Sequence, residues 1–395
     1  MALRLITAGE SHGPALIAVV DGLPAGLPVT EAYINGDLVR RQRGYGRGAR
    51  MQIEKDTVRI LSGVRFERTL GSPVSLYIEN RDWENWREVM SVEAPGGNQP
   101  VPETRPRPGH GDFAGMVKFD THDARDVLER ASARETAARV AAGALARCLL
   151  EEVGIKIMSG VVSIGRVSAQ SDNDVSESQF EGVDEDPLRC ADSDASKLMM
   201  EEIDRAAQDG DTLGGTFQVA AFGAPPGLGS PAQFDRRLDA RLCGALASIP
   251  GVKGVEVGEG FAIAEVRGSE AHDEIHYEKA CGIFRPTNRA GGLEAGMTNG
   301  ETILLRAAMK PIPTLGRPLA TVDSERLEPA QAFKERADVC AVPAAAVVGE
   351  AVVALVIADA LLEKFGGDSM AELSRNHAGY LRQINKLWKP RGQRA

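Results

Sequence analysis

Short apolar runs separated by glycine-rich breaks open the chain. Residues 3–8 and 15–20 are two such runs, and they predict a strand, a turn and a second strand. After a further Gly/Pro-rich break, Thr30 is placed to cap an amphipathic helix. Alternating apolar residues at 58–61 and 74–78 predict two more strands, paired antiparallel. The first part of the chain therefore predicts four strands, with one helix between the second and the third.

Two long apolar stretches predict helices. Asp123 can cap a helix that runs to about Val153, with alanine and leucine at the i, i+3, i+4 spacing of a buried stripe. The second stretch, 339–362, contains Glu350 and Asp359. Charges inside an apolar segment favour a buried core helix over a membrane span. We therefore expect both helices to lie in the interior of a soluble protein.

The second half of the chain repeats the pattern of the first. Residues 9–27 align without gaps on 210–228, sharing a Gly-acid-hydroxyl-x-Gly turn, an apolar strand and a Gly-x-Pro-x-Gly-Leu break. The match returns at the ends of the two helices, where 149–154 resembles 361–366. Chance similarity of two β/α segments is the alternative. We expect two pseudo-symmetric halves, about 3–154 and 205–366, fused into a single domain 1–395 around two central helices, with 386–395 frayed.

Charge and cysteine content narrow the function classes. The chain has 395 residues and a formal net charge of −10, which disfavours general binding to nucleic acid or to an anionic membrane. The five cysteines form no CxxC pair, so we predict neither a disulfide framework nor a metal site. No signal-peptide pattern begins the chain, and the expected location is the cytoplasm. An anion site would have to be a local cluster of arginine or lysine.

The first candidate for chemistry is the turn Gly9-Glu10-Ser11-His12-Gly13. A histidine in a tight turn can transfer protons near neutral pH, and a solvated turn histidine is the alternative. The repeat has Leu213 at the place of His12. Because the second turn forms without a histidine, the architecture explains the turn and leaves His12 as a catalytic candidate.

Arginines gather in two glycine-rich loops and on one helix. The loop 43–51 and the residues before it carry Arg40, Arg41, Arg43, Arg47 and Arg50. The long loop 94–115 places Arg105 and Arg107 next to His110. Arg130 and Arg134 stand one turn apart near a predicted helix start, where cations are unfavourable unless an anion binds. The alternatives are solvated loops, an RNA contact, or salt bridges to Glu129 or Glu135.

Standard nucleotide and metal motifs are missing from the sequence. It has no GxxxxGK[ST] loop, and its GxGxG near Arg47 lacks the helix that a dinucleotide fold requires. His272 and His276 are four apart, but Asp273 stands where a metalloprotease helix needs glutamate. The acidic stretch 172–194 is typical of a solvated excursion. We therefore predict an anion-binding site built from arginines, without a metal.

Seven segments together resemble chorismate synthase, an enzyme of the shikimate pathway. They lie, in the family's order, at 9–13, 43–51, 105–112, 129–139, 288–300, 310–314 and 336–343. The resemblance extends from residue 3 to about 365. It implies an α+β fold, a β-α-β sandwich, and a homotetramer.

The resemblance also implies an activity and a cofactor. The expected reaction is an anti-1,4 elimination of phosphate and a C6 hydrogen from 5-enolpyruvylshikimate 3-phosphate, giving chorismate. The family requires reduced FMN, although the reaction has no net redox change. NADPH is a candidate source of reducing equivalents, directly or through an external flavin reductase. A non-catalytic protein that binds a phosphorylated or flavin ligand is the alternative, and the three catalytic candidates named below weigh against it.

Roles follow residue by residue from the same resemblance. His12 would protonate the departing phosphate, His110 would protonate or polarise the reduced flavin, and Asp338 would help to relay the substrate proton. The substrate-binding candidates are Arg41, Arg47, Arg50, Arg107 and Arg134. The flavin-binding candidates are Arg130, Ala131, Ser132, Pro250, Gly251, Ala295, Lys310, Pro311, Ile312, Pro313, Thr314 and Arg336. The family often has Gly-Gly at Ala295-Gly296 and Asn/Gln-Ala at Pro250-Gly251.

Overall fold

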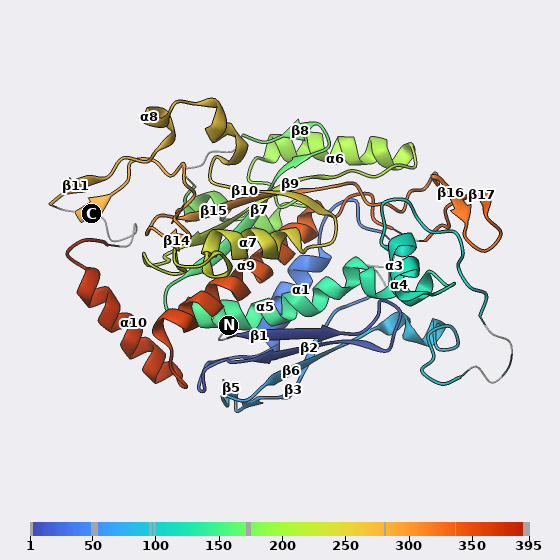
Figure 1. Ribbon diagram of the computed structural model, residues 1–395, viewed down its shortest axis with the longest axis horizontal. Helices are drawn as coiled ribbons and strands as arrows, with labels where there is room; N and C mark the ends of the chain where they lie inside the picture. Colours follow the sequence, from blue (N-terminus) through green and yellow to red (C-terminus); the bar gives the residue numbers. More distant parts are fainter. Residues whose placement is uncertain are drawn as a thin grey trace.

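Two antiparallel sheets enclose a layer of helices in the computed structural model (Figure 1). The structure describes residues 3–48, 54–94, 97, 100–170, 175–279, 282–335 and 337–389. The first sheet has the order β1-β2-β6-β3, with bounds Arg4–Ala8, Ala15–Asp21, Val74–Glu79 and Val58–Ser62. The second has the order β10-β15-β9-β7-β8, with bounds Val252–Val257, Ile303–Met309, Gly215–Phe222, Lys156–Ile164 and Val167–Ser168.

The middle layer consists of helices from both halves of the chain. Its members are α1 (Glu31–Gln42), α5 (Thr136–Glu151), α7 (Leu238–Ala247) and α9 (Val342–Phe365). Helices α5 and α9 pack directly on each other, and a Cβ added at Gly143 would lie 2.4 Å from the Cβ of Ala351. Helix α9 is long and apolar enough to span a membrane, but it is buried between the sheets. The predicted β-α-β sandwich with central long helices is confirmed.

The two halves have the same topology. In the first half the chain runs β1, β2, α1, β3, β6 and α5; in the second it runs β7, β9, α7, β10, β15 and α9. Both sheets place the equivalent strands in the same order, and β8 is added at the edge of the second. The sequence repeat reveals the second half only from about 205. The structural equivalence extends it back to Lys156, because α6 (Ser193–Gln208) is inserted between β7 and β9.

The predicted single helix from Asp123 to Val153 is wrong in one respect: it is broken. The segment forms α4 (Arg125–Ala131), a 3-10 turn η2 (Ala133–Glu135) and then α5. Ser132 has extended backbone angles, and its hydroxyl accepts a hydrogen bond from the N–H of Arg134 at 3.3 Å. Serine competes in this way with regular helical hydrogen bonds. α4 and α5 are therefore two separate helices joined by Ser132 and η2.

Smaller elements surround the sandwich. They are β4 (Val64–Arg65), β5 (Arg68–Thr69), η1 (Arg81–Asn85), α3 (Asp112–Phe119), η3 (Glu177–Phe180), η4 (Val183–Glu185), η5 (Phe234–Arg236), η6 (Gly260–Glu265), α8 (Gly268–Ala271), β11 (His276–Glu278), β12 (Gly282–Phe284), β13 (Leu293–Glu294), β14 (Met297–Thr298), β16 (Ala320–Asp323), β17 (Glu328–Gln331) and α10 (Met370–Ile384). Helix α10 lies at one end of the sandwich, and the segment from α8 to β11 projects from it (Figure 1).

Candidate active site

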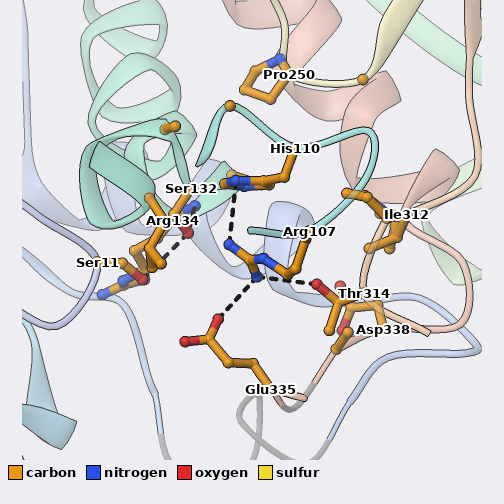
Figure 2. A pocket seen from close by; sticks show the side chains of 18 of the residues that line it. Ser11, Arg107, His110, Ser132, Arg134, Pro250, Ile312, Thr314, Glu335 and Asp338 are labelled. Atoms are coloured by element: carbon orange, nitrogen blue, oxygen red, sulfur yellow. Dashed lines mark hydrogen bonds and ion pairs between the residues drawn. The ribbon is translucent and has the colours of Figure 1, made fainter. Parts of the chain in front are cut away.

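One cavity of about 890 Å³ collects most of the predicted site residues. It lies where the break between α4 and α5 meets the segment that leads into α9, so both halves of the chain line it. Figure 2 shows the side chains that surround it, among them His110, Arg107 and Asp338. Residues far apart in the sequence are thus brought to a single site.

His12 is held in the cavity wall by a buried carboxylate. Its Nδ1 lies 2.7 Å from Oε2 of Glu129, and its backbone N–H donates to the same oxygen at 3.1 Å. The ring stacks on the indole of Trp86, with 4.0 Å between the ring centroids. Burial tends to raise the pKa of Glu129, but hydrogen bonds from His12 and the nearby charge of Arg125 lower it on balance. Glu129 is therefore ionised, and the Nε2 of His12 is the nitrogen available to a ligand.

His110 has a similar partner but a different electrostatic setting. Its Nδ1 contacts the carboxylate of Asp112, which is fully buried, and lies 3.2 Å from a guanidinium nitrogen of Arg107. Arg107 also donates to Asp112 from its backbone N–H at 3.0 Å and from Nε at 2.9 Å. Burial alone would raise the pKa of Asp112, but the hydrogen bonds from His110 and Arg107 lower it to about 2. Asp112 thus serves two cavity side chains at once.

Arg107 links the loop that carries His110 to the opposite wall. Its guanidinium donates to Oγ1 of Thr314 at 3.1 Å and to Oε2 of Glu335 at 3.0 Å, and Figure 2 marks both bonds. The other carboxylate oxygen of Glu335 lies 3.8 Å from a guanidinium nitrogen of Arg125 and, among the described residues, is buried without a hydrogen-bond partner. A ligand with a hydroxyl or an N–H group could satisfy that oxygen.

Arg41 and Arg134 form the most buried cationic part of the cavity. Arg41 donates from Nε to Oγ1 of Thr136 at 3.0 Å, and Arg134 donates from Nε to Oδ1 of Asn80 at 3.0 Å. Burial lowers the pKa of Arg41 to about 10; Asp56 opposes that shift, while the like charges of Arg134 and Arg47 add to it. Guanidinium groups this close repel one another, so an anion in the cavity would relieve the repulsion.

Asp338 faces the same cationic group from the second half of the chain. Its carboxylate pairs with Arg47 at 2.9 Å and accepts the backbone N–H of Gly48 at 2.6 Å. The loop approaches so closely that a Cβ added at Gly48 would lie 2.8 Å from the carbonyl oxygen of Ala337. The glycine is therefore needed for the contact that brings Arg47 and Asp338 together.

Most of the predicted flavin-binding residues form the remaining wall. The cavity is lined by Ala131, Ser132, Pro250, Gly251, Lys310, Pro311, Ile312, Pro313 and Thr314. The N–H of Lys310 donates to the carbonyl of Gly251 at 2.9 Å, which joins two of these loops. Burial and the neighbouring Lys253 lower the pKa of the Lys310 side chain. This wall combines apolar surface with an ammonium group.

Some predicted residues lie elsewhere. Ala295 sits in the hairpin between β13 and β14, away from the cavity wall. The Arg130 side chain turns to the carbonyls of Thr7 and Gly9, each at 3.1 Å, and lines a neighbouring cavity of about 760 Å³. Ala131, Ser132 and Pro250 line both cavities. Arg50 and Arg336 lie outside the described residues.

The structure adds site residues that the sequence did not reveal. Glu129 and Asp112 hold the two histidines, and Trp86 stacks on His12. Asp112 is two residues from His110, so spacing could have suggested that pair. Glu129 is distant from His12 in the sequence, and no local signal connects them. Among the described residues, no group of three or more His, Cys, Asp or Glu side chains is placed to hold a metal ion.

Known proteins are similar to this chain over nearly its whole length. Residues 3–362 match the family model described as chorismate synthase. Chorismate synthase of Desulforudis audaxviator is 59% identical over 97% of this chain and 98% of that protein. The Aquifex aeolicus protein of the same name is 52% identical over 98% of this chain and 99% of its own. A crystal structure of a chorismate synthase, 42% identical, aligns with a TM-score of 0.80 over 98% of this chain and 99% of that one.

Proposed function

The chain belongs to the chorismate synthase family, and on that premise we propose that it converts 5-enolpyruvylshikimate 3-phosphate to chorismate and phosphate with reduced FMN bound. The single observation that carries the proposal is the convergence of two histidines, Asp338 and a group of buried arginines on one cavity. A phosphorylated dicarboxylate needs cationic ligands, and its elimination needs a proton donor.

The buried arginines suit the substrate. Burial, together with the nearby charges of Arg134 and Arg47, lowers the pKa of Arg41. Asp56 pairs with Arg41 and Arg134, and Asp338 pairs with Arg47. The substrate's phosphate and carboxylates would add further anionic partners to this cluster. Guanidinium groups bind such anions through paired hydrogen bonds. We assign these three, together with Arg107, to substrate binding, and we propose the same role for Arg50.

The cavity also fits a flavin mononucleotide. Its volume of about 890 Å³ lies in the range of small-molecule sites, and its wall offers apolar surface for a flat ring beside cationic groups. Ala131, Ser132, Pro250, Gly251 and the 310–314 loop would hold the cofactor. When bound, reduced FMN would supply an electron-rich ring that assists the elimination without net redox change. For Arg130, Ala295 and Arg336 we propose flavin contacts at the edge of the site or across a subunit boundary.

Side chains of this protein would carry out the proton transfers. His12 would donate a proton from Nε2 to the phosphate oxygen as the C3–O bond breaks. The C6 hydrogen leaves as a proton, and Asp338, fixed by Arg47 and Gly48, would take part in carrying it away. His110 would hold a proton toward the cofactor, and Asp112 would orient its ring. Such acid-base groups typically contribute about 10²- to 10⁴-fold each.

Assembly and supply of reductant complete the proposal. We propose a cytoplasmic homotetramer that receives reducing equivalents from NADPH, either directly or through a separate flavin reductase. The described part of the chain is accounted for by the sandwich and its peripheral elements, and we identify no separate reductase domain there.

An anaerobic assay tests the function. Purified protein with chemically reduced FMN is expected to release phosphate and chorismate from the substrate, whereas protein with oxidised FMN should release neither. NADPH added with oxidised FMN separates the two reductant routes, because only a self-reducing enzyme would then turn over. Absence of phosphate release with both forms of FMN would contradict the proposed function.

A further inference from the structure

We propose that Glu129 is a positioning residue that fixes the orientation and the proton arrangement of His12. The inference rests on the proposed function, in which His12 is the acid. The two residues lie on different elements: His12 is in the turn after β1, and Glu129 is in α4.

Glu129 receives three hydrogen bonds. Nδ1 and the backbone N–H of His12 both approach Oε2, at 2.7 Å and 3.1 Å, and Arg125 donates to Oε1 at 3.0 Å. The Glu129 residue is only 2% exposed. An ionised carboxylate accepts hydrogen bonds and cannot donate them. Nδ1 of His12 must therefore carry a proton, whichever protonation state the ring has.

Trp86 completes the restraint on the ring. The indole and imidazole planes are stacked at an angle of 26°, and the guanidinium of Arg125 lies 5.1 Å from the indole centroid. Trp86 fixes the plane of the ring, and Glu129 fixes its rotation within that plane. The neutral ring then presents an unprotonated Nε2 to the cavity, and the protonated ring presents an N–H donor there.

The carboxylate matters because His12 gives up a proton in the proposed reaction. A buried negative charge next to Nδ1 stabilises the imidazolium that must form before each donation. In Glu129→Gln, Arg125 would retain the amide oxygen and the NH₂ group would face Nδ1. The neutral ring would then carry its proton on Nε2, without a counter-charge to stabilise the imidazolium. That ring could occupy the same place but would lack the negative charge that its donating form faces in the wild type.

The His110–Asp112 pair differs from the His12–Glu129 pair in the position of its arginine, Arg107. The carboxylate of Asp112 is shared between His110 and Arg107, whose guanidinium nitrogen lies 3.2 Å from Nδ1 of His110. Glu129 is likewise shared with an arginine, since Arg125 donates to its Oε1 at 3.0 Å, but the described part of the chain shows no arginine contact at Nδ1 of His12 like the one that Arg107 makes with Nδ1 of His110. Control of the imidazolium by a carboxylate is thus expected to be stronger at His12.

Kinetics of four variants test the proposal: Glu129→Gln, His12→Ala, the double variant, and Glu135→Gln. Glu135 is a matched control because it is also buried and hydrogen-bonded, to Thr7 and Arg139, but lines only the neighbouring cavity. Glu129→Gln should lower kcat about 10²-fold or more, as loss of a histidine-orienting carboxylate does elsewhere. KM should stay within about twofold, because the interaction is used in the transition state. At saturating FMN, Glu135→Gln should keep wild-type kcat, because its 3.8 Å ion pair with Arg130 would affect FMN affinity and not the proton transfer from His12.

The outcomes separate this inference from the proposed function. If Glu129 acts through His12, the double variant should be no slower than His12→Ala, and additive losses would overturn the inference. Wild-type kcat in Glu129→Gln together with a slow His12→Ala would overturn the inference alone. Wild-type kcat in His12→Ala would overturn the assignment of His12 as the acid and, with it, this inference, whereas absence of turnover in the wild type would overturn the proposed function.

A spectroscopic measurement needs no Glu129 variant. Solid-state ¹⁵N spectra of histidine-labelled wild-type protein, collected where the imidazoles are neutral, report which nitrogen carries the proton. The His12 signal is identified by its loss in His12→Gln. We expect a protonated Nδ1 and an unprotonated Nε2, and the reverse tautomer would overturn the proposal.

Discussion

The two halves of the molecule build the same turn and use it differently. In the first half, the N–H of Ser11 donates to the carbonyl of Glu129 at 2.9 Å, and His12 lines the cavity. In the second half, the N–H of Leu213 donates to the carbonyl of Val339 at 2.9 Å, and Leu213 packs against the core. Each turn thus ties the start of a sandwich strand to the segment before a central helix.

The second turn positions the wall that the first turn faces. The hydroxyl of Thr212 donates to the carbonyl of Ile312 at 2.7 Å, and Leu213 forms a bridge to Cys340. These contacts fix the 310–314 loop and the residues after Asp338. The difference teaches that the repeated architecture provides a frame, whereas the proposed proton donor stands on one copy only.

The largest expected effect comes from removing the histidine of the first turn. His12→Ala should lower kcat about 10²- to 10⁴-fold, because an acid group is lost, while the fold is kept. Leu213→Ala is the matched change in the second turn and should mainly lower thermal stability. Steady-state kinetics and thermal melts of both variants give the comparison. Equal losses of kcat would show that the two turns do not differ in role.

A second variant breaks the link between the halves. Glu350 of α9 is buried and accepts hydrogen bonds from Arg40 of α1 at 2.7 and 2.8 Å and from Arg189 at 3.0 Å. Burial alone would raise the pKa of Glu350, but Arg40, Arg189 and Arg147 lower it from 4.5 to about 2. Glu350→Gln should lower the free energy of unfolding by about 3–5 kcal/mol, because buried cations lose their partner. Chemical denaturation at pH 7 measures the loss.

The same carboxylate predicts a pH dependence. Because the pKa of Glu350 is lower in the folded state, its contribution is complete above pH 4.5 and is lost as the pH falls toward about 2. The free energy of unfolding of the wild type should therefore fall more steeply across this window than that of Glu350→Gln. Parallel curves for the two proteins would refute the assignment.

A glycine substitution in the second turn tests whether both turns are needed for the fold. A Cβ at Gly9 would lie 2.2 Å from the carbonyl oxygen of Ala15, and one at Gly214 would lie 2.3 Å from that of Met309. Gly214→Ala should cost about 1–3 kcal/mol of stability, because the backbone must shift. It should also weaken FMN binding, since Met309 leads into Lys310. Unchanged melting and FMN titration curves would count against the shared frame.

The smallest expected effect comes from one hydroxyl. Thr212→Val removes the hydrogen bond to the carbonyl of Ile312. The free energy of unfolding should fall by about 0.5–1.5 kcal/mol. If the second turn only positions the cavity wall, the variant should bind FMN more weakly than the wild type, while its kcat should change less. A fall in kcat with unchanged FMN affinity would reverse that interpretation.

Much of this arrangement could be predicted from the sequence, because it depends on local pattern. Apolar periodicity located both central helices, and the repeat of 9–27 in 210–228 indicated the two halves. The repeat also singled out His12 by contrast with Leu213. The start of the second half at Lys156 was missed, because the insertion that carries α6 separates its first strand from the recognisable repeat.

The site's supporting residues could not be predicted in the same way. Glu129 holds His12 from across the fold, and Asp56 lies between two arginines, so both roles depend on tertiary packing. The break at Ser132 was hidden by the strong helical pattern on both sides of it. Arg130 shows why local pattern was not sufficient. Its position in the sequence suggested a ligand contact, but its side chain donates to the carbonyls of Gly9 and Thr7 and does not line the 890 Å³ cavity.

In the proposed reaction, residues of the first half carry out an elimination with reduced FMN, and both halves provide the frame. The most direct test of this reaction is an anaerobic single turnover with protein-bound reduced FMN, in which phosphate, chorismate and flavin absorbance are measured together. We predict equal amounts of phosphate and chorismate per site, with the flavin still reduced at the end. Phosphate release without chorismate, or stoichiometric oxidation of the flavin, would contradict the account.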